Sequence, residues 1–267
     1  MTFLSPLDEA ALSAACHRLW PGASARCLDS TNSTNDDARA LGLSGAPHGS
    51  VITADSQSSG RGRRGAPWIS PPGRNLILSI LLRPSLPPEL WSRLTHAAAL
   101  AVTHTLDLSP ALPPATIKWP NDVLLANRKV SGILLESVLH ASSGFVVVGL
   151  GINLNASPDD FPPDLRTTAT SIFSENGGIL TDRTAFTISF LESLAQSITT
   201  ATADFPSLLA ACSQRSSLAG KSIRLTSHGT EFTGAWAGLG PNGELLLRLP
   251  NGTTTPFSSA DLVRPID

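Results

Sequence analysis

The apolar residues of this chain fall into short runs, and their spacing alternates between two periods along most of the sequence. Strand-like runs such as 50–54 are separated by segments like 88–106, where Leu90, Leu94 and Ala101 recur at helical spacing. This alternation predicts α-helices and β-strands packed around one mixed sheet. The predicted strands cover 50–54, 75–83, 116–119, 122–125, 129–138 and 145–154, and the predicted helices cover 7–19, 88–106, 184–200 and 205–214.

The sequence carries no sign of a membrane segment or a leader. No apolar run approaches the roughly 20 residues that span a bilayer. Residues 1–15 contain acidic side chains and lack the basic and apolar regions of a signal peptide. We therefore expect a cytoplasmic protein that does not bind membranes.

The composition changes near Leu218. The last 50 or so residues alternate short β-type runs with turn signals such as Asn251-Gly252. Several short strands at this spacing predict a small antiparallel barrel. The boundary is expected between Arg215 and Gly220, which gives a catalytic domain at 1–216 and a C-terminal domain at 217–267.

The charged residues constrain the function. The chain has 21 acidic and 19 basic side chains and a net charge of −2, which argues against a dedicated nucleic-acid-binding protein. Only three of the basic residues are lysines, namely Lys118, Lys129 and Lys221, and the chain contains no tyrosine. Lysine chemistry therefore has three candidates, and general-base chemistry through tyrosine is excluded.

The cysteines and histidines do not form a metal-binding pattern. Cys16, Cys27 and Cys212 are odd in number and widely spaced, so we expect buried free thiols. The six histidines lack the spacing of metal ligands. We expect no metal site built from protein side chains.

The segment Gly60-Arg61-Gly62-Arg63-Arg64-Gly65 is the strongest candidate for a ligand-binding loop. Its glycines let the backbone approach a ligand, and its arginines suit phosphate oxygens. The segment does not fit a P-loop or a Rossmann fingerprint, because the spacing differs and no helical pattern follows directly. The alternative interpretation is a flexible, solvated basic loop.

A second candidate is Ile117-Lys118-Trp119-Pro120-Asn121-Asp122. The predicted strand ends at Pro120, so Lys118 is held at a strand end beside an aromatic residue and a turn. Such an ammonium group suits a phosphate. The alternative is an edge-strand lysine followed by an ordinary turn.

Two weaker candidates complete the set. The run 147–153 is a buried strand ending in glycines and Asn153, a pattern that also fits a simple turn. In Ser33-Thr34-Asn35, Asn35 is expected to cap a helix, while the two hydroxyls suit a neutral polar ligand.

The order and spacing of these motifs resemble the biotin protein ligases. The resemblance rests on STNDDARAL, ADSQSSGRGRRGAPWISPPGRNLILSILLRP, IKWPNDVLLANRKVSGILLES and VVVGLGINLN, and extends from about residue 24 to the C-terminus. It implies an α+β fold in which helices flank a mixed β-sheet, as in class II aminoacyl-tRNA synthetases and biotin synthetases. It also implies that the C-terminal barrel is SH3-like.

The resemblance implies a site for biotin and a site for ATP. It favours the second copy of the Ser-Thr-Asn motif over Ser30-Thr31-Asn32, because the second copy fits the distance to Gln57 better. The implied biotin-binding residues are Ser33, Thr34, Asn35, Gln57, Gly60, Arg61, Gly62, Arg63, Lys118, Gly132, Ile133 and Leu134. The implied ATP- and adenylate-binding residues are Arg61, Arg63, Trp68, Asn75, Lys118, Asn121 and Asn153.

The resemblance also implies the reaction. The biotin carboxylate attacks the α-phosphate of ATP and gives biotinyl-5′-AMP and pyrophosphate, with Lys118, Arg63 and Mg²⁺ stabilising the phosphoryl oxygens. Biotin then passes to a lysine of a biotin carboxyl carrier protein without a covalent enzyme intermediate. Lys129 is expected to support the ligand side, and Lys221 is expected to be structural.

Two departures from the family pattern stand out. The family usually has arginine where this chain has Ala66, so Arg64 or Arg74 supplies that charge or adenylate retention is weaker. About 25 residues precede the first matching segment, too few for the winged helix-turn-helix of ligases that are also repressors. We therefore expect a monofunctional ligase without DNA binding, and a homodimer is possible.

Two other functions were weighed against this one. A lipoate or octanoate ligase shares the architecture but needs no hydroxyls for a ureido group. An RNA-binding module could use Arg61, Arg63 and Arg64 on a phosphate backbone, but the overall acidity of the chain and the absence of interleaved aromatic residues oppose it.

Overall fold

A seven-stranded mixed sheet forms the centre of the protein. The computed structural model describes residues 5–140 and 143–266. The strand order is β1-β2-β3-β7-β6-β5-β4, with β1 and β2 parallel and the other pairs antiparallel. The strands are β1 (Ala25–Leu28), β2 (Ser50–Ala54), β3 (Leu76–Leu82), β4 (Thr116–Lys118), β5 (Asp122–Leu125), β6 (Arg128–His140) and β7 (Ser143–Ile152).

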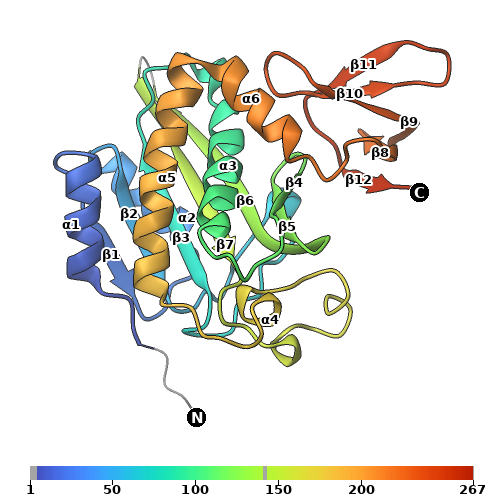
Figure 1. Cartoon of the computed structure of the whole chain (residues 1–267). Coiled ribbons are helices and arrows are strands. Elements are labelled where there is room, and N and C mark those ends of the chain that lie inside the picture. The colour runs from blue at the N-terminus through green and yellow to red at the C-terminus, as the bar shows by residue number, and fades with distance from the viewer. Residues whose placement is uncertain (1–4, 141–142, 267) are drawn as a thin grey trace.

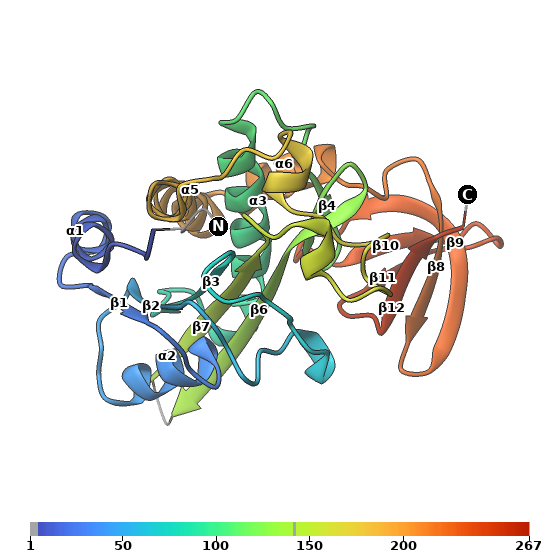
Figure 2. The same ribbon diagram turned by 90° about the horizontal axis from the view of Figure 1, so that it is seen from below.

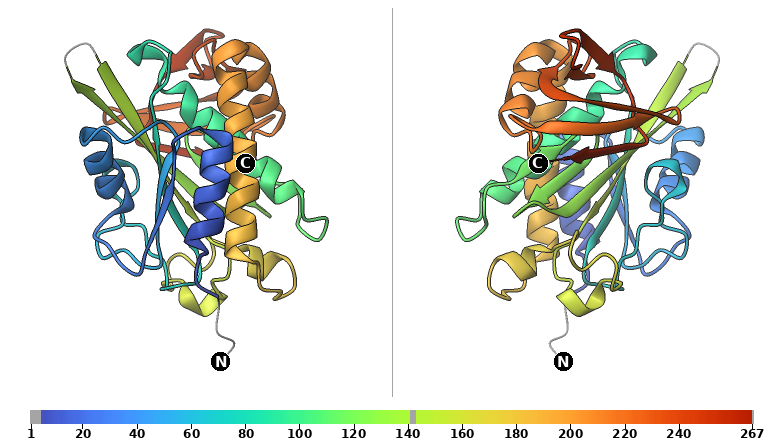
Figure 3. Two further views of the ribbon diagram at one scale, coloured as in Figure 1. Left: turned by 90° about the vertical axis from the view of Figure 1, so that its left-hand side faces the viewer. Right: turned by 90° about the vertical axis from the view of Figure 1, so that its right-hand side faces the viewer.

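Helices cover the two faces of this sheet unequally. One face is covered by α1 (Glu9–Leu19), α3 (Arg93–Asp107), α5 (Arg183–Ala203) and α6 (Phe205–Gln214), and α2 (Thr34–Leu43) lies on the other (Figures 1 and 2). The views in Figure 3 show α1 and α5 side by side along the first face. The short helix α4 (Ile172–Glu175) follows β7. The second face is therefore open beyond α2.

The alternation of side chains along β7 explains how both faces are buried. Val146 and Val148 join the large core beneath α3 and α5. Phe145 and Val147 point the other way and pack with Ala38 of α2. This second core ends where the strand continues into glycines.

The last five strands form a separate antiparallel sheet in the order β11-β10-β9-β8-β12. Its core includes Trp119, which comes from the end of β4 and donates its indole N–H to the carbonyl of Gly243 at 2.9 Å. The small sheet therefore packs directly beside the end of β4 (Figures 1 and 2). Its strands are β8 (Ser222–Ser227), β9 (Thr230–Leu239), β10 (Leu245–Arg248), β11 (Thr254–Phe257) and β12 (Leu262–Pro265).

Most of the predicted elements are confirmed, including the strand at 50–54 and the helix at 205–214. The four-residue strands β1 and β12 were missed because they are too short to show a period. The helix predicted at 88–106 is a 3₁₀ turn followed by α3 from Arg93. The domain division at 216/217 stays a prediction; α6 ends at Gln214 and β8 begins at Ser222.

Two local predictions were wrong. Ser33, and not Asn35, is the N-cap residue of α2, because Ser33 has an extended backbone and the helix begins at Thr34. Asn35 lies inside the first turn, where its side chain is free to reach the sheet. Cys16 and Cys212 are buried free thiols as expected, whereas Cys27 is only half-buried.

Across residues 5–140 and 143–266, no helix is both long enough and apolar enough to cross a bilayer.

His96 on α3 makes the stability of the protein depend on pH. Its ring is buried against Gly243 and Phe205, and burial lowers its pKa from 6.5 to about 4. Below about pH 6.5 the unfolded chain takes up a proton that the folded chain refuses, so stability falls as the pH drops toward 4. Between about pH 7.5 and about pH 5 this group alone removes about 2 kcal/mol of unfolding free energy.

Urea unfolding of the wild type and of His96→Gln at both pH values tests this prediction. The wild type should lose about 2 kcal/mol more than the variant on acidification. An equal loss in both proteins would show that His96 does not titrate as its burial requires.

Candidate active site

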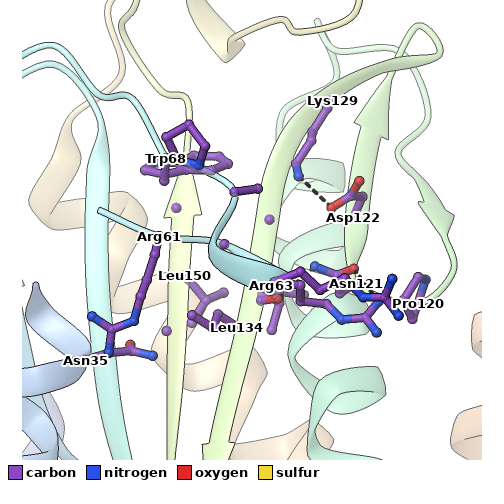
Figure 4. Close-up of a pocket in the computed structure, with 18 of the residues that line it drawn as sticks. Asn35, Arg61, Arg63, Trp68, Pro120, Asn121, Asp122, Lys129, Leu134 and Leu150 are labelled. Atoms are coloured by element: carbon purple, nitrogen blue, oxygen red, sulfur yellow. Dashed lines mark hydrogen bonds and ion pairs between the residues drawn. The ribbon is translucent and has the colours of Figure 1, made fainter. Parts of the chain in front are cut away.

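A cavity of about 260 Å³ opens on the face of the large sheet that carries α2. Its walls come from α2, the loop at 60–68, strands β6 and β7, and residues 260–263 of the small sheet (Figure 4). The predicted site residues that line it are Ser33, Thr34, Asn35, Gln57, Arg61, Gly62, Arg63, Trp68, Lys118, Asn121, Gly132, Ile133 and Leu134. Gly60 and Asn75 lie outside this wall.

The first copy of the Ser-Thr-Asn motif does not contribute to the cavity wall, whereas the second copy does. The side chain of Gln57 joins the second copy to the loop: its Oε1 accepts from the backbone N–H of Thr34 at 2.8 Å and from the Thr34 hydroxyl at 3.1 Å. The preference for the second copy therefore agrees with the geometry.

Glycines in the middle of two strands make room for the side chains above them. A β-carbon on Gly149 would lie 2.1 Å from Oδ1 of Asn35, and one on Gly151 would lie 2.1 Å from the indole of Trp68. Gly132, paired with Gly151 across the sheet, is also covered by Trp68. The glycines of 147–153 thus lie within β7 and not in a turn, and they allow Asn35 and Trp68 to lie close to the sheet.

The loop at 60–65 is held by ion pairs and hydrogen bonds on the cavity side. Arg61 extends toward α2 (Figure 4) and forms two hydrogen bonds with Asp36, at 2.8 and 2.6 Å. This contact lowers the pKa of the Asp36 carboxyl. Arg63 donates to Oδ1 of Asn121 at 3.4 Å, and burial lowers its pKa. Both arginines are therefore positioned before any ligand binds.

The partners of Arg64 and Arg74 bear on whether either arginine supplies the charge that is missing at Ala66. Arg64 has a left-handed backbone with φ of 58° and forms an ion pair with Asp261 of the small sheet. Arg74 lies 3.6 Å from Asp160. Both guanidinium groups are engaged, so neither lies free to replace an arginine at position 66.

A second cavity, of about 380 Å³, adjoins the first. The two share a wall made by Pro67, Trp68, Lys118, Asp122 and Lys129. The far side of the second cavity is formed mainly by the segment 161–169, which follows β7.

Two lysines occupy the shared wall in different states. Lys129 forms an ion pair with Asp122 at 2.7 Å, and its ammonium lies 5.6 Å from the centre of the Trp68 ring (Figure 4). The side chain of Lys118 makes no hydrogen bond or ion pair with the residues that the structure describes. Burial lowers the pKa of Lys118, and Lys129 and Arg264 lower it further, while Asp122 opposes the shift.

Asn75 and Asn153 are both buried, and their side chains are hydrogen-bonded to each other. Nδ2 of Asn75 donates to Oδ1 of Asn153 at 3.1 Å, and the backbone N–H of Leu154 donates to Asn75 at 3.1 Å. Asn153 also donates to the carbonyl of Thr170 at 3.0 Å and lines the second cavity. Asn75 therefore contacts the site through Asn153.

Sequence reasoning missed Ser79 and Glu136, which contact Asn35, and Asp261, which lines the cavity; it named Asp122 only as part of the turn after Lys118. A signal existed for two of them. Ser79 is the lone polar residue in an apolar strand, and Glu136 follows Gly132 and Leu134 at the strand period of two. Asp261 gives no such signal, because only the fold brings its loop to the cavity.

Within residues 5–140 and 143–266, no group of three or more histidine, cysteine, aspartate or glutamate side chains is arranged to hold a metal ion. Asp122 and Asp261, which line the cavity, and Asp36 and Glu136, which contact the Arg61 side chain, each face a cationic side chain.

The fold and the paired cavities define a ligase-type catalytic domain, and comparison with known proteins gives the family. Residues 24–153 match the biotin/lipoate A/B protein ligase family. The biotin–[acetyl-CoA-carboxylase] ligase of Mycobacterium tuberculosis is 34% identical over 97% of this chain and 96% of its own length. The chain belongs to the biotin protein ligase family.

Two further comparisons show how much of this chain and of each relative the similarity covers. A biotin protein ligase from Aquifex aeolicus in complex with biotin and ATP superimposes with a TM-score of 0.79 at 26% identity, covering 90% of this chain and 98% of that one. The bifunctional ligase/repressor BirA of Bacillus spizizenii is 37% identical over 56% of this chain, and the chain matches 46% of its length. The expected ligase fold, with helices on a mixed sheet and a second antiparallel sheet, is confirmed.

Proposed function

We propose that this protein is a biotin–[biotin carboxyl-carrier protein] ligase. It activates biotin with ATP to biotinyl-5′-AMP and transfers the biotin to a lysine of a carrier protein. The observation that supports this most directly is the pair of adjoining cavities whose common wall carries Lys118 and Lys129. Two substrates that react with each other need two pockets that meet at the reacting atoms.

The first cavity suits biotin. It combines the hydroxyl and amide groups of Ser33, Thr34 and Gln57 with apolar wall from Ile133 and Leu134. A ureido group needs hydrogen-bond donors and acceptors, and an aliphatic chain needs apolar surface. The biotin carboxylate would then point toward the shared wall and the cations of the loop.

The second cavity suits the nucleotide. Asn153 and the segment 161–169 line it, and Trp68 separates it from the first cavity. In this arrangement the α-phosphate would lie at the shared wall, near Lys118, Lys129 and Arg63. Asn121, held between Arg63 and the carbonyl of Ile133, would help to position this end.

The first chemical step follows from these charges. A carboxylate oxygen of biotin bonds to the α-phosphorus, and the bond from that phosphorus to the oxygen shared with the β-phosphate breaks. Negative charge on the transferring oxygens is stabilised by Lys118 and by Arg63, which Asn121 holds in advance. In the second step the acceptor amine attacks the carbonyl of the mixed anhydride, AMP leaves and the amine loses a proton.

Mg²⁺ belongs to this proposal as a companion of ATP. The carboxylates of the first cavity already face arginine or lysine side chains, so the protein offers a poor resident metal site. The ion would be held chiefly through the phosphates, which are its usual ligands. Its contribution is to reduce the negative charge that Lys118 and Arg63 face.

The decisive experiment is labelling of a purified carrier domain with biotin and ATP. We expect label only when both substrates are present, with pyrophosphate released in the first step. Lipoate in place of biotin serves as the comparison, because a lipoate ligase has the same architecture. Pyrophosphate release with lipoate and none with biotin would replace the proposal by its runner-up.

Ala66 provides a test of how the adenylate is retained. Ala66 lines the first cavity and is exposed, so an arginine there reaches the phosphate without displacing a buried group. An exposed ion pair contributes up to about 1 kcal/mol, so Ala66→Arg should slow adenylate dissociation by about fivefold. Ala66→Gln, which adds length without charge, is the control. An unchanged dissociation rate in Ala66→Arg would mean that this position does not affect retention.

A further inference from the structure

Ser79 is a polar residue in a strand whose other side chains are all apolar. It lies at the centre of the strand β3, between Leu78 and Ile80, and is completely buried. Its hydroxyl lies 2.6 Å from Oδ1 of Asn35 and 2.8 Å from the hydroxyl oxygen of Thr34. It therefore supports two residues of the first cavity from below.

Glu136 approaches the same amide from the opposite side. Nδ2 of Asn35 donates to the Glu136 carboxylate at 2.5 Å. The same carboxylate lies 3.4 Å from the guanidinium of Arg61. A carboxylate can only accept hydrogen bonds, so this contact fixes which end of the Asn35 amide faces Glu136. Oδ1 then faces Ser79, where the hydroxyl is the donor.

These contacts divide the polar groups of the cavity into two sets. The amide of Asn35 is engaged at both ends by side chains of this chain. The hydroxyl of Thr34 donates to Gln57. The hydroxyl of Ser33 and the amide Nε2 of Gln57 have no hydrogen-bond partner among the described residues. These two groups remain available for a ligand.

We propose that Ser79 and Glu136 are positioning residues that hold the Asn35 amide as a fixed floor of the biotin pocket. Asn35 does not bond to the ligand; Ser33 and Nε2 of Gln57 meet the ureido group. Ser79 also holds Thr34, and through Thr34 it orients Gln57 so that Nε2 faces the cavity. This inference rests on the proposed function, because it concerns how that function selects its acid substrate.

Steady-state kinetics on four variants of the full-length protein test the inference. Ser79→Ala leaves Oδ1 of Asn35 without its donor, and we expect the KM for biotin to rise about tenfold while kcat changes less than about threefold. Glu136→Ala should behave in the same way. Glu136→Gln keeps an acceptor for Asn35, so it should restore the KM to within about threefold of the wild type.

Ser131→Ala is the matched control. Ser131 is equally buried in the same sheet, and its hydroxyl has no hydrogen-bond partner among the described residues. It should leave the KM for biotin unchanged. Thermal unfolding of all four variants separates a change in the pocket from loss of fold, and Glu136, whose side chain is 39% exposed, can be replaced without opening the core.

The outcomes distinguish this inference from the proposed function. If the wild type labels a carrier with biotin but folded Ser79→Ala and Glu136→Ala keep the wild-type KM, the positioning role is wrong and the function stands. Equal loss of kcat and of affinity for both substrates in these variants would also overturn it, because that pattern signals general damage. If the wild type shows no biotin-dependent activity, the proposed function itself fails.

Discussion

Replacing Lys118 with alanine is expected to reduce kcat for adenylate formation by about 100-fold, because one fixed cation is lost from the developing phosphoryl charge. Burial in the wall between the two cavities lowers the pKa of Lys118, and the side chain has no partner among the described residues. Its ammonium is therefore available to a phosphate without first leaving an ion pair. Pyrophosphate release under saturating biotin and ATP measures the effect.

Lys129 and Lys221 provide the comparison for this variant. Lys129 lines the same wall but is paired with Asp122, so its alanine variant also disturbs Asp122 and Trp68. Lys221 precedes β8, outside both cavities, and Lys221→Ala should retain wild-type kcat. Undiminished carrier labelling by Lys118→Ala, with loss of labelling by Lys129→Ala, would transfer the role to Lys129.

Gly149→Ala is expected to raise the KM for biotin by at least about tenfold. The new β-carbon would lie 2.1 Å from Oδ1 of Asn35, so the amide must move away from Ser79. Forcing one extra carbon into a packed region costs about 1–3 kcal/mol, and the middle of this range corresponds to about 30-fold in affinity. Isothermal titration with biotin measures the change directly.

Gly240→Ala is the control for a glycine that lines neither cavity. A β-carbon there meets the end of the Glu244 side chain, which can rotate aside. Biotin affinity should stay at the wild-type value in this variant. If folded Gly149→Ala also binds biotin like the wild type, the floor of the cavity is not as rigid as these contacts require.

Much of the fold and of the site was accessible from the sequence because local patterns carry it. Period-two and helical spacing located the long elements, and the order of the motifs placed Ser33, Gln57, Arg61 and Lys118 in one site. The structure brings these residues to one cavity. What the patterns lacked was the register between strands distant in sequence.

The parts of the site that the sequence did not predict depend on the register between strands. Ser79 lies opposite Gly149, and Gly149 lies opposite Leu134, so residues from three strands meet below Asn35. No spacing within one strand reveals that alignment. For the same reason the sequence left a simple turn open as an alternative for the glycines of β7, which in the structure clear space for side chains from α2 and from the loop at Trp68.

Trp119 gives the small sheet a mechanical role in the site. Its indole is locked into the core of that sheet, while its neighbours Lys118 and, one residue beyond Pro120, Asn121 line the first cavity. A rotation of the small sheet would therefore move both cavity residues at once. Conversely, we expect a ligand that binds to Lys118 and Asn121 to restrain the orientation of the small sheet as well.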